Sequence, residues 1–183
     1  MEAKLQQQLA WVKQEPMYQI HLDLRKVYDA LDQGHCLEIL AGYGVRPNLL
    51  CLQKKLWDNT KMVCCASDYY GLPFEAHCGV TQGGALSSLM FHVCVDCVIR
   101  EWLQQVLGDD TARDGVKEAV RDYCIAFFVD DRLVAARCPA WLQSSFNILI
   151  KLFECIGLLA NSEKTKVIMC VCVCSGLPVP GVV

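Results

Sequence analysis

The pattern of apolar and polar residues along the chain predicts strands that alternate with helices. Residues 17–23 alternate between apolar and polar side chains, as expected of a strand with one face toward a core. Two apolar runs, residues 123–129 and 133–136, are separated by Asp130-Asp131-Arg132 and predict a hairpin. The other predicted elements are helices over residues 2–14, 33–41, 86–107 and 139–157, a helix that begins at Pro47, and strands over residues 61–67, 74–78 and 166–174.

Turn and linker residues divide these elements. Gly71-Leu72-Pro73 predicts the turn between the strands 61–67 and 74–78, and residues 108–115 form the clearest linker. Strands that pair locally, with helices between them, indicate the α+β class. We expect an antiparallel sheet with helices packed on one face, close to the split βαβ, or ferredoxin-like, arrangement. In the helix over residues 86–107, the predicted apolar face consists of Leu86, Met90, Val93 and Cys97.

Composition and charge narrow the classes of protein. The chain has 183 residues, of which 54% are apolar and 20% charged, so it can bury a core and is not disordered. We expect one domain over residues 1–176 and a loose tail over residues 177–183. The formal net charge of -3 excludes a protein that holds nucleic acid by bulk positive charge. A site for a polyanion must therefore be a local groove or use metal ions.

The 13 cysteines raise the question of whether the protein resides in an oxidising or a reducing compartment. No signal peptide is visible near Met1, so a secreted disulfide scaffold is disfavoured, and we expect a reduced, intracellular chain in the cytoplasm or nucleus. The uncharged stretch from residue 167 onward is interrupted by glycine and proline after eight apolar residues, which predicts a buried strand and no membrane span. Cys94-x-x-Cys97 lies within a predicted helix without a second cysteine pair, which favours packing over a metal or redox site.

Aspartates at two places in the chain are candidates for metal chemistry. Asp130 and Asp131 interrupt an apolar hairpin, and Asp23 ends a strand on its polar face. Each alone is also typical of an ordinary turn or helix cap. If the strand ending at Asp23 lies beside the hairpin, the three carboxylates converge at one sheet edge and suit one or two Mg²⁺ ions. Two such ions can stabilise the attacking and leaving oxygens of a phosphoryl displacement.

A glycine-rich loop over residues 79–88 precedes the long helix. It lacks the lysine of a P-loop and the glycine spacing of a dinucleotide-binding fingerprint. A flexible helix start would explain it, and so would close backbone approach to a nucleotide or template strand at Gly83 and Gly84, with Gln82 as hydrogen-bonding side chain. Lys54, Lys55 and Lys61 are candidates for contact with a nucleic-acid backbone, although a solvated helix face fits them equally well.

Taken together, these segments resemble the palm of reverse transcriptases, most closely those of non-LTR retrotransposons and group II introns. The resemblance spans about residues 17–170 and implies a palm-type sheet. It implies one domain of a larger retroelement polyprotein, with the fingers and thumb of that family missing from this stretch. Four segments carry it in the family's order: Asp23 to Asp29 with Tyr28, residues 79–88 with Gln82-Gly83, Phe128-Val129-Asp130-Asp131, and residues 157–161 with Lys164-Thr165-Lys166.

The resemblance implies a role for each matching residue. Asp23 and Asp130 would be the principal metal ligands, with Asp131 beside them, and the cofactors would be two Mg²⁺ or Mn²⁺ ions. Tyr28 would fill the space that a ribose 2′-hydroxyl needs and so select deoxynucleotides. Lys164 would lie near the triphosphate and offset charge on the leaving pyrophosphate.

Gln82 and Gly83 would line the pocket for the incoming nucleotide, and the implied reaction is RNA-directed DNA polymerisation. Its partners would be an RNA template, a DNA primer and deoxynucleoside triphosphates. An alternative from another class is a catalytically inactive retroelement remnant that folds and binds RNA without polymerising. A metal-dependent phosphatase would also use clustered aspartates, but it would leave Tyr28 and the Gln82-Gly83 loop unexplained.

Overall fold

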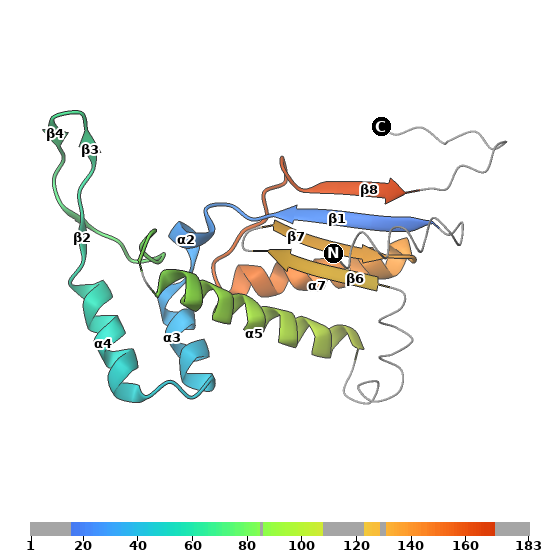
Figure 1. Ribbon diagram of the computed structural model, residues 1–183, viewed down its shortest axis with the longest axis horizontal. Helices are drawn as coiled ribbons and strands as arrows, with labels where there is room; N and C mark the ends of the chain where they lie inside the picture. Colours follow the sequence, from blue (N-terminus) through green and yellow to red (C-terminus); the bar gives the residue numbers. More distant parts are fainter. Residues whose placement is uncertain (1–15, 85, 108–122, 129–130, 171–183) are drawn as a thin grey trace. The chain divides into compact units, whose positions relative to one another are not determined.

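The computed structural model describes residues 16–84, 86–107, 123–128 and 131–170, drawn in colour in Figure 1. These residues form two compact units, which are described separately. Unit 1 is built from residues 16–24, 103–107, 123–128, 131–148 and 160–170, and unit 2 from residues 25–84, 86–102 and 149–159.

Unit 1 contains a four-stranded antiparallel sheet. Its strands are β1 (Met17–Asp23), β6 (Tyr123–Phe128), β7 (Asp131–Ala136) and β8 (Lys166–Cys170), in the order β6-β7-β1-β8. All neighbouring pairs are antiparallel, and β7 lies between β1 and β6. This strand order is that of a split βαβ arrangement. The predicted α+β class with an antiparallel palm-type sheet is confirmed.

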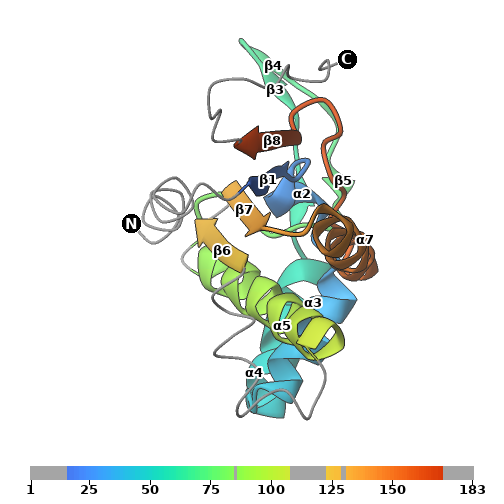
Figure 2. The same cartoon turned by 90° about the vertical axis from the view of Figure 1, so that its right-hand side faces the viewer.

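Burial along the central strands follows the predicted alternation only in part, because Gln19, on the predicted polar face of β1, is 5% exposed and Ala135 of β7 is 1% exposed. Ile20 and Leu22 on β1 and Val134 and Ala136 on β7 are all at most 3% exposed. The first part of α7 (Pro139–Cys155), which belongs to unit 1 as far as Ile148, runs alongside the sheet in Figures 1 and 2. Residues on both faces of these two strands are therefore buried, because successive side chains of a strand point to opposite faces.

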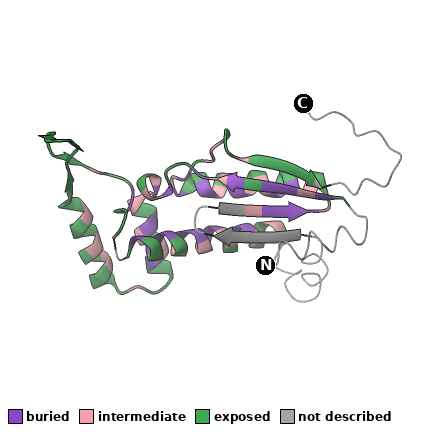
Figure 3. Cartoon of the chain, turned by 45° about the horizontal axis from the view of Figure 1, so that its top comes forward, coloured by how far each residue is buried: buried purple, intermediate pink, exposed green. Residues whose placement is uncertain are grey.

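Unit 2 consists mainly of helices. It contains α2 (Val27–Ala30), α3 (Gln33–Gly42), α4 (Pro47–Asp58) and most of α5 (Ser87–Leu107). Local sequence explains where two of them begin: the Asp32 carboxylate caps α3 by accepting from the His35 backbone N–H at 2.7 Å, and Pro47 occupies the first turn of α4. No residue of α4 is buried, as Figure 3 shows by the absence of purple on this helix.

The segment between α4 and α5 differs from its prediction. In place of two longer strands it forms two short ladders, in which β2 (Lys61–Met62) pairs with β5 (Phe74–Glu75) and β3 (Cys65–Ala66) with β4 (Tyr69–Tyr70). The chain reverses at Ser67, whose φ is 55°, and not at the predicted Gly71-Leu72-Pro73 turn. The inner pairing of Ala66 with Tyr69 closes a shorter loop than the predicted pairing would, so it costs less conformational entropy.

The apolar face of α5 was also predicted wrongly. Leu86, just before the helix, is 54% exposed, and Val93 and Cys97 are only partly buried. The buried side chains of α5 include Phe91, Cys94, Val98 and Trp102, together with the predicted Met90. The helix is apolar on more than one face, so the sequence pattern did not determine which face would be covered.

Several predicted elements lie outside the described residues. They are the helix over residues 2–14, the linker over residues 108–115, and the end of the last strand beyond Cys170. The cysteines whose side chains are described are free thiols. No helix in the described ranges has the length and apolar character needed to cross a membrane.

Candidate functional site

Unit 1 brings two of the predicted carboxylate residues opposite each other. Asp23 is the last residue of β1, and its Cα is paired directly with that of Asp131, the first residue of β7. Directly opposite Cα atoms in an antiparallel pair are about 4.5–5.5 Å apart. Asp131 is also paired with Phe128 of β6, so its backbone lies between two strands. Asp130 lies outside the described residues.

The Asp23 side chain is partly exposed and unpaired within the described residues, whereas its backbone is fixed by hydrogen bonds. Within the described residues, its carboxylate has no hydrogen-bond or ion-pair partner. The Asp23 backbone N–H donates to Thr165 Oγ1 at 3.4 Å, and its carbonyl accepts from the Asn161 N–H at 2.8 Å. The strand end is therefore anchored without use of the side chain that was predicted to bind metal.

The same contacts attach Lys164 to this part of the sheet. The Asn161 carbonyl accepts from the N–H groups of Lys164 at 3.2 Å and Thr165 at 2.8 Å, which closes a turn next to the end of β1. Lys164 is exposed, and its ammonium group is unpaired within the described residues. Asn161 and Thr165 belong to the fourth segment of the family resemblance, which assigned them no role of their own. Their hydrogen bonds position the turn.

The donor set at the end of β1 fits a hard divalent cation. Carboxylate oxygens are the ligands that Mg²⁺ prefers, and a carboxylate without a protein partner is available to bind one. Among the described side chains, which do not include those of Asp130 and Asp131, no group of three or more histidines, cysteines or acids could hold a metal. Asp23, Asp130 and Asp131 stay the predicted ligands of such an ion.

Unit 2 brings Tyr28 together with the glycine-rich loop. The Tyr28 ring packs against Phe91 of α5 with 5.3 Å between ring centroids, and its carbonyl accepts from the Val80 N–H at 2.6 Å. The Gly79 N–H donates to the Leu31 carbonyl at 2.7 Å. A Cβ at Gly79 would lie 2.8 Å from the Tyr28 carbonyl oxygen, so only glycine allows this close approach. The loop is thereby fixed against the start of the helical region.

Gln82 is held at the same place by a residue that had no assigned role. Its side-chain amide donates to Asp29 Oδ1 at 3.2 Å, so the second predicted motif contacts the first through Asp29. The signal for this contact in the sequence was that Asp29 belongs to the first motif, directly after Tyr28. Gly83 adopts a φ of 80°, and Gly84 N donates to the Thr81 carbonyl at 3.0 Å, which forms the turn before α5.

Other candidate residues are placed apart from these contacts. Lys54 and Lys55 are exposed on α4. Cys94 is fully buried on α5, where contact with the Cys36 sulfur, together with burial, raises the pKa of its thiol far above the usual range. This burial agrees with the packing role predicted for the cysteine pair, of which Cys97 is partly buried.

Comparison with solved structures shows the same fold in telomerases. The telomerase of Candida tropicalis in complex with a fragment of telomeric RNA matches with a TM-score of 0.66 and 16% identity, over 91% of this chain and 29% of that one. Its apo form truncated from the C-terminal domain matches with 0.64 and 18%, over 92% and 35%. The Candida albicans telomerase complex matches with 0.56 and 16%, over 91% and 29%. The chain thus spans about a third of the length of these proteins.

Sequence comparison identifies the family. No curated protein matches the chain. The family model described as reverse transcriptase (RNA-dependent DNA polymerase) matches residues 2–179, which is nearly the whole sequence. On this match, the chain belongs to the reverse transcriptase family.

Proposed function

We propose that this chain contains the catalytic centre of an RNA-directed DNA polymerase, which adds deoxynucleotides to the 3′ end of a primer on an RNA template. The observation that carries the proposal is the pairing of Asp23 with Asp131 across β1 and β7. Membership of the reverse transcriptase family supports the reaction type. The partners would be an RNA template, a DNA primer and deoxynucleoside triphosphates, in the cytoplasm or nucleus.

Electrostatics gives a physical reason for a cation at this pair. Two carboxylates about 4 Å apart repel each other by about 4 kcal/mol at an effective dielectric constant of 20. Asp23 has no basic partner among the described residues that would offset repulsion from a neighbouring carboxylate. Asp23, Asp130 and Asp131 would hold two Mg²⁺ or Mn²⁺ ions, which when bound supply Lewis-acid stabilisation of the attacking and leaving oxygens.

The remaining residues bind and orient the substrates in this proposal. The Tyr28 ring, fixed against Phe91, excludes a ribose 2′-hydroxyl. Gln82, held by Asp29, and Gly83 line the nucleotide pocket, while Gly84 lies against the template. The Lys164 ammonium contacts the triphosphate and offsets the charge that develops on the leaving group.

Primer extension on an RNA template with Mg²⁺ or Mn²⁺ tests the proposal. Asp23→Asn removes a charged ligand without changing the size of the side chain, and we expect a loss of about 10²–10³-fold or more in rate. Asp68→Asn, at an exposed position in the β3–β4 turn, is the matched control and should retain the wild-type rate. Binding of primer–template, measured by fluorescence anisotropy, should be similar in all three proteins.

The outcomes separate the two functional hypotheses. Undiminished extension by Asp23→Asn would contradict the role of this carboxylate. No extension by the wild-type chain, with RNA binding retained, would instead favour the non-catalytic retroelement remnant. The similarity to non-LTR and group II intron enzymes stays a prediction that this assay does not address.

A further inference from the structure

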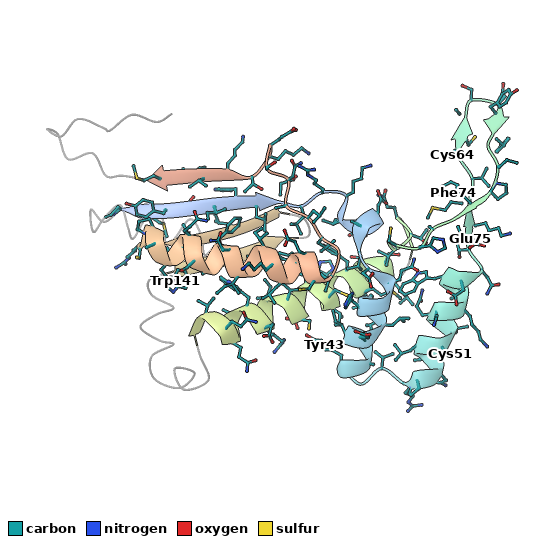
Figure 4. The ribbon with its side chains drawn as sticks, turned by 180° about the vertical axis from the view of Figure 1, so that it is seen from behind. Tyr43, Cys51, Cys64, Phe74, Glu75 and Trp141 are labelled. Carbon is teal, nitrogen blue, oxygen red and sulfur yellow. The ribbon has the colours of Figure 1, made fainter. Side chains whose placement is uncertain are left out.

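Unit 2 contains a cavity that the proposed polymerase centre does not use. It has a volume of about 490 Å³ and lies between α3, the end of α4 and strand β5. Cavities of about 300–1,000 Å³ are typical of sites for small molecules. None of the aspartates proposed to hold metal lines it, and neither do Tyr28 or Gln82. Figure 4 labels Glu75, one of the lining residues, at the foot of the two-stranded ribbon beside α4.

One wall of the cavity is aromatic. Trp57 lines it together with the apolar side chains of Leu37 and Ala76. Trp57 is partly exposed, and it lies on α4, a helix in which no residue is buried. An indole ring on the wall of an open cavity offers a flat surface on which a planar group can stack.

The polar lining offers hydrogen-bonding groups of both kinds. Lys54 and His77 provide donors, and Asp58 and Glu75 provide carboxylate acceptors. Within the described residues, none of these four side chains forms a hydrogen bond or ion pair. One lysine and two acids give the lining a formal charge of −1 with histidine neutral, so a simple anion is not the preferred ligand. A planar ligand with N–H donors matches the two carboxylates and the indole ring. Any negative charge on such a ligand would have to lie next to Lys54.

We propose that this cavity binds an unpaired nucleobase of single-stranded RNA. The base stacks on Trp57, its exocyclic amino group donates to Asp58 or Glu75, and the adjoining phosphate contacts Lys54. Proteins that bind single-stranded nucleic acid hold unpaired bases by this combination of aromatic stacking and contacts to the base edge. The inference rests on the proposed function only in that the proposed template is RNA, because binding at the cavity requires no catalysis.

The register of β2 and β5 adds a second cation next to the site. Lys61 is paired directly with Glu75, and it is exposed and has no ion-pair partner in the described part of the chain. Lys54 and Lys61 therefore flank the carboxylates from two elements. A strand that places one base in the cavity can keep its phosphates near these lysines and away from Asp58.

Binding of short RNA strands to the full chain tests the inference. The probes are fluorescently labelled oligoadenylate, oligouridylate, and an oligoadenylate with abasic linkers, measured by anisotropy without added nucleotide. We expect Trp57→Ala to weaken oligoadenylate binding by about 5- to 150-fold, the effect of losing one stacked base. Trp57→Phe, which keeps a ring, should retain most of the affinity and covers the case in which the alanine variant does not fold.

Two neighbouring lysines provide a matched control. Lys54 lines the cavity and Lys55, the next residue of the same exposed helix, does not. Lys54→Ala should weaken binding and reduce the slope of log affinity against log salt by about 0.7, the value for one phosphate contact on a single strand. Lys55→Ala, which changes a lysine outside the lining, should weaken binding much less, and equal losses for the two variants would contradict the contact assigned to Lys54.

The base itself is tested by the choice of strand. Adenine has an exocyclic amino group and uracil has none, so oligoadenylate should bind more tightly than oligouridylate, and the abasic strand most weakly. Equal binding of the adenylate and abasic strands, or unchanged binding by Trp57→Ala, would overturn the inference. Asp23→Asn should bind oligoadenylate normally, so a failure at the cavity is distinguished from a failure of the proposed catalytic centre.

Discussion

Gly79 offers the sharpest test of how the glycine-rich loop is held. Its φ is 82°, a region that side-chain-bearing residues rarely adopt, and a Cβ there would lie 2.7 Å from the Asp29 carbonyl oxygen. The atoms that the Cβ would meet belong to the backbone, so no side-chain rotation can relieve the contact. We expect Gly79→Ala to displace the loop that carries Gln82 from the segment that carries Tyr28.

The size of the effect can be worked out from two contributions. A non-glycine residue in the left-handed region costs about 1–2 kcal/mol. Displacing the loop also loses the bonds from Gly79 N–H to the Leu31 carbonyl (2.7 Å) and from Val80 N–H to the Tyr28 carbonyl (2.6 Å). Each such bond contributes about 0.5–1.5 kcal/mol net, so the free energy of unfolding should fall by about 2–5 kcal/mol.

Urea unfolding followed by circular dichroism measures this change, and the chain offers a matched control. Gly83 has nearly the same φ, 80°, but a Cβ there would meet nothing within 4 Å. Gly83→Ala should therefore lose only the conformational part, about 1–2 kcal/mol. Equal losses for the two variants would refute the argument, because they would show that the close approach at Gly79 contributes nothing.

Two further predictions concern ionisable groups. The hydrogen bond from the His35 backbone N–H lowers the pKa of Asp32 below its value of 3.8, so the stabilisation is present above that pH and is lost as the pH falls through the folded value. Asp32→Ala should cost about 1 kcal/mol near neutral pH, and urea unfolding should show this difference shrinking as the pH falls below 3.8. A thiol reagent at about pH 8 should modify the exposed Cys51 well before Cys94, whose pKa is raised by contact with Cys36 and by burial. Peptide mass spectrometry of a time course checks this order, and equal rates would contradict it.

Features coded by neighbouring residues were predictable from the sequence. The strand over residues 17–23 is confirmed at both ends, and the helix predicted to begin at Pro47 begins there. The hairpin is confirmed with one change, since Asp131 and Arg132 belong to β7. These features depend on side-chain alternation and on the fixed φ of proline, which act within a few residues.

Features that depend on distant contacts required the tertiary structure. The face of α5 that is buried could not be read from a helix that is apolar on more than one side, and the site at Trp57 depends on α3, α4 and β5 meeting. Asp29 acquires its contact to Gln82 only when residues 53 positions apart come together.

The sequence alone determined which residues were candidates for the catalytic centre, because the spacing of aspartates, glycines and a lysine in four motifs is a local property. Only the tertiary structure decided that Asp23 lies opposite Asp131. That register is set by hydrogen bonds between strands more than a hundred residues apart and by the burial of Ile20 and Val134 beside them. A shift of one residue would break the Ile20–Val134 pairing and would no longer place Asp23 opposite Asp131, so the register of β1 and β7 brings the two aspartates together.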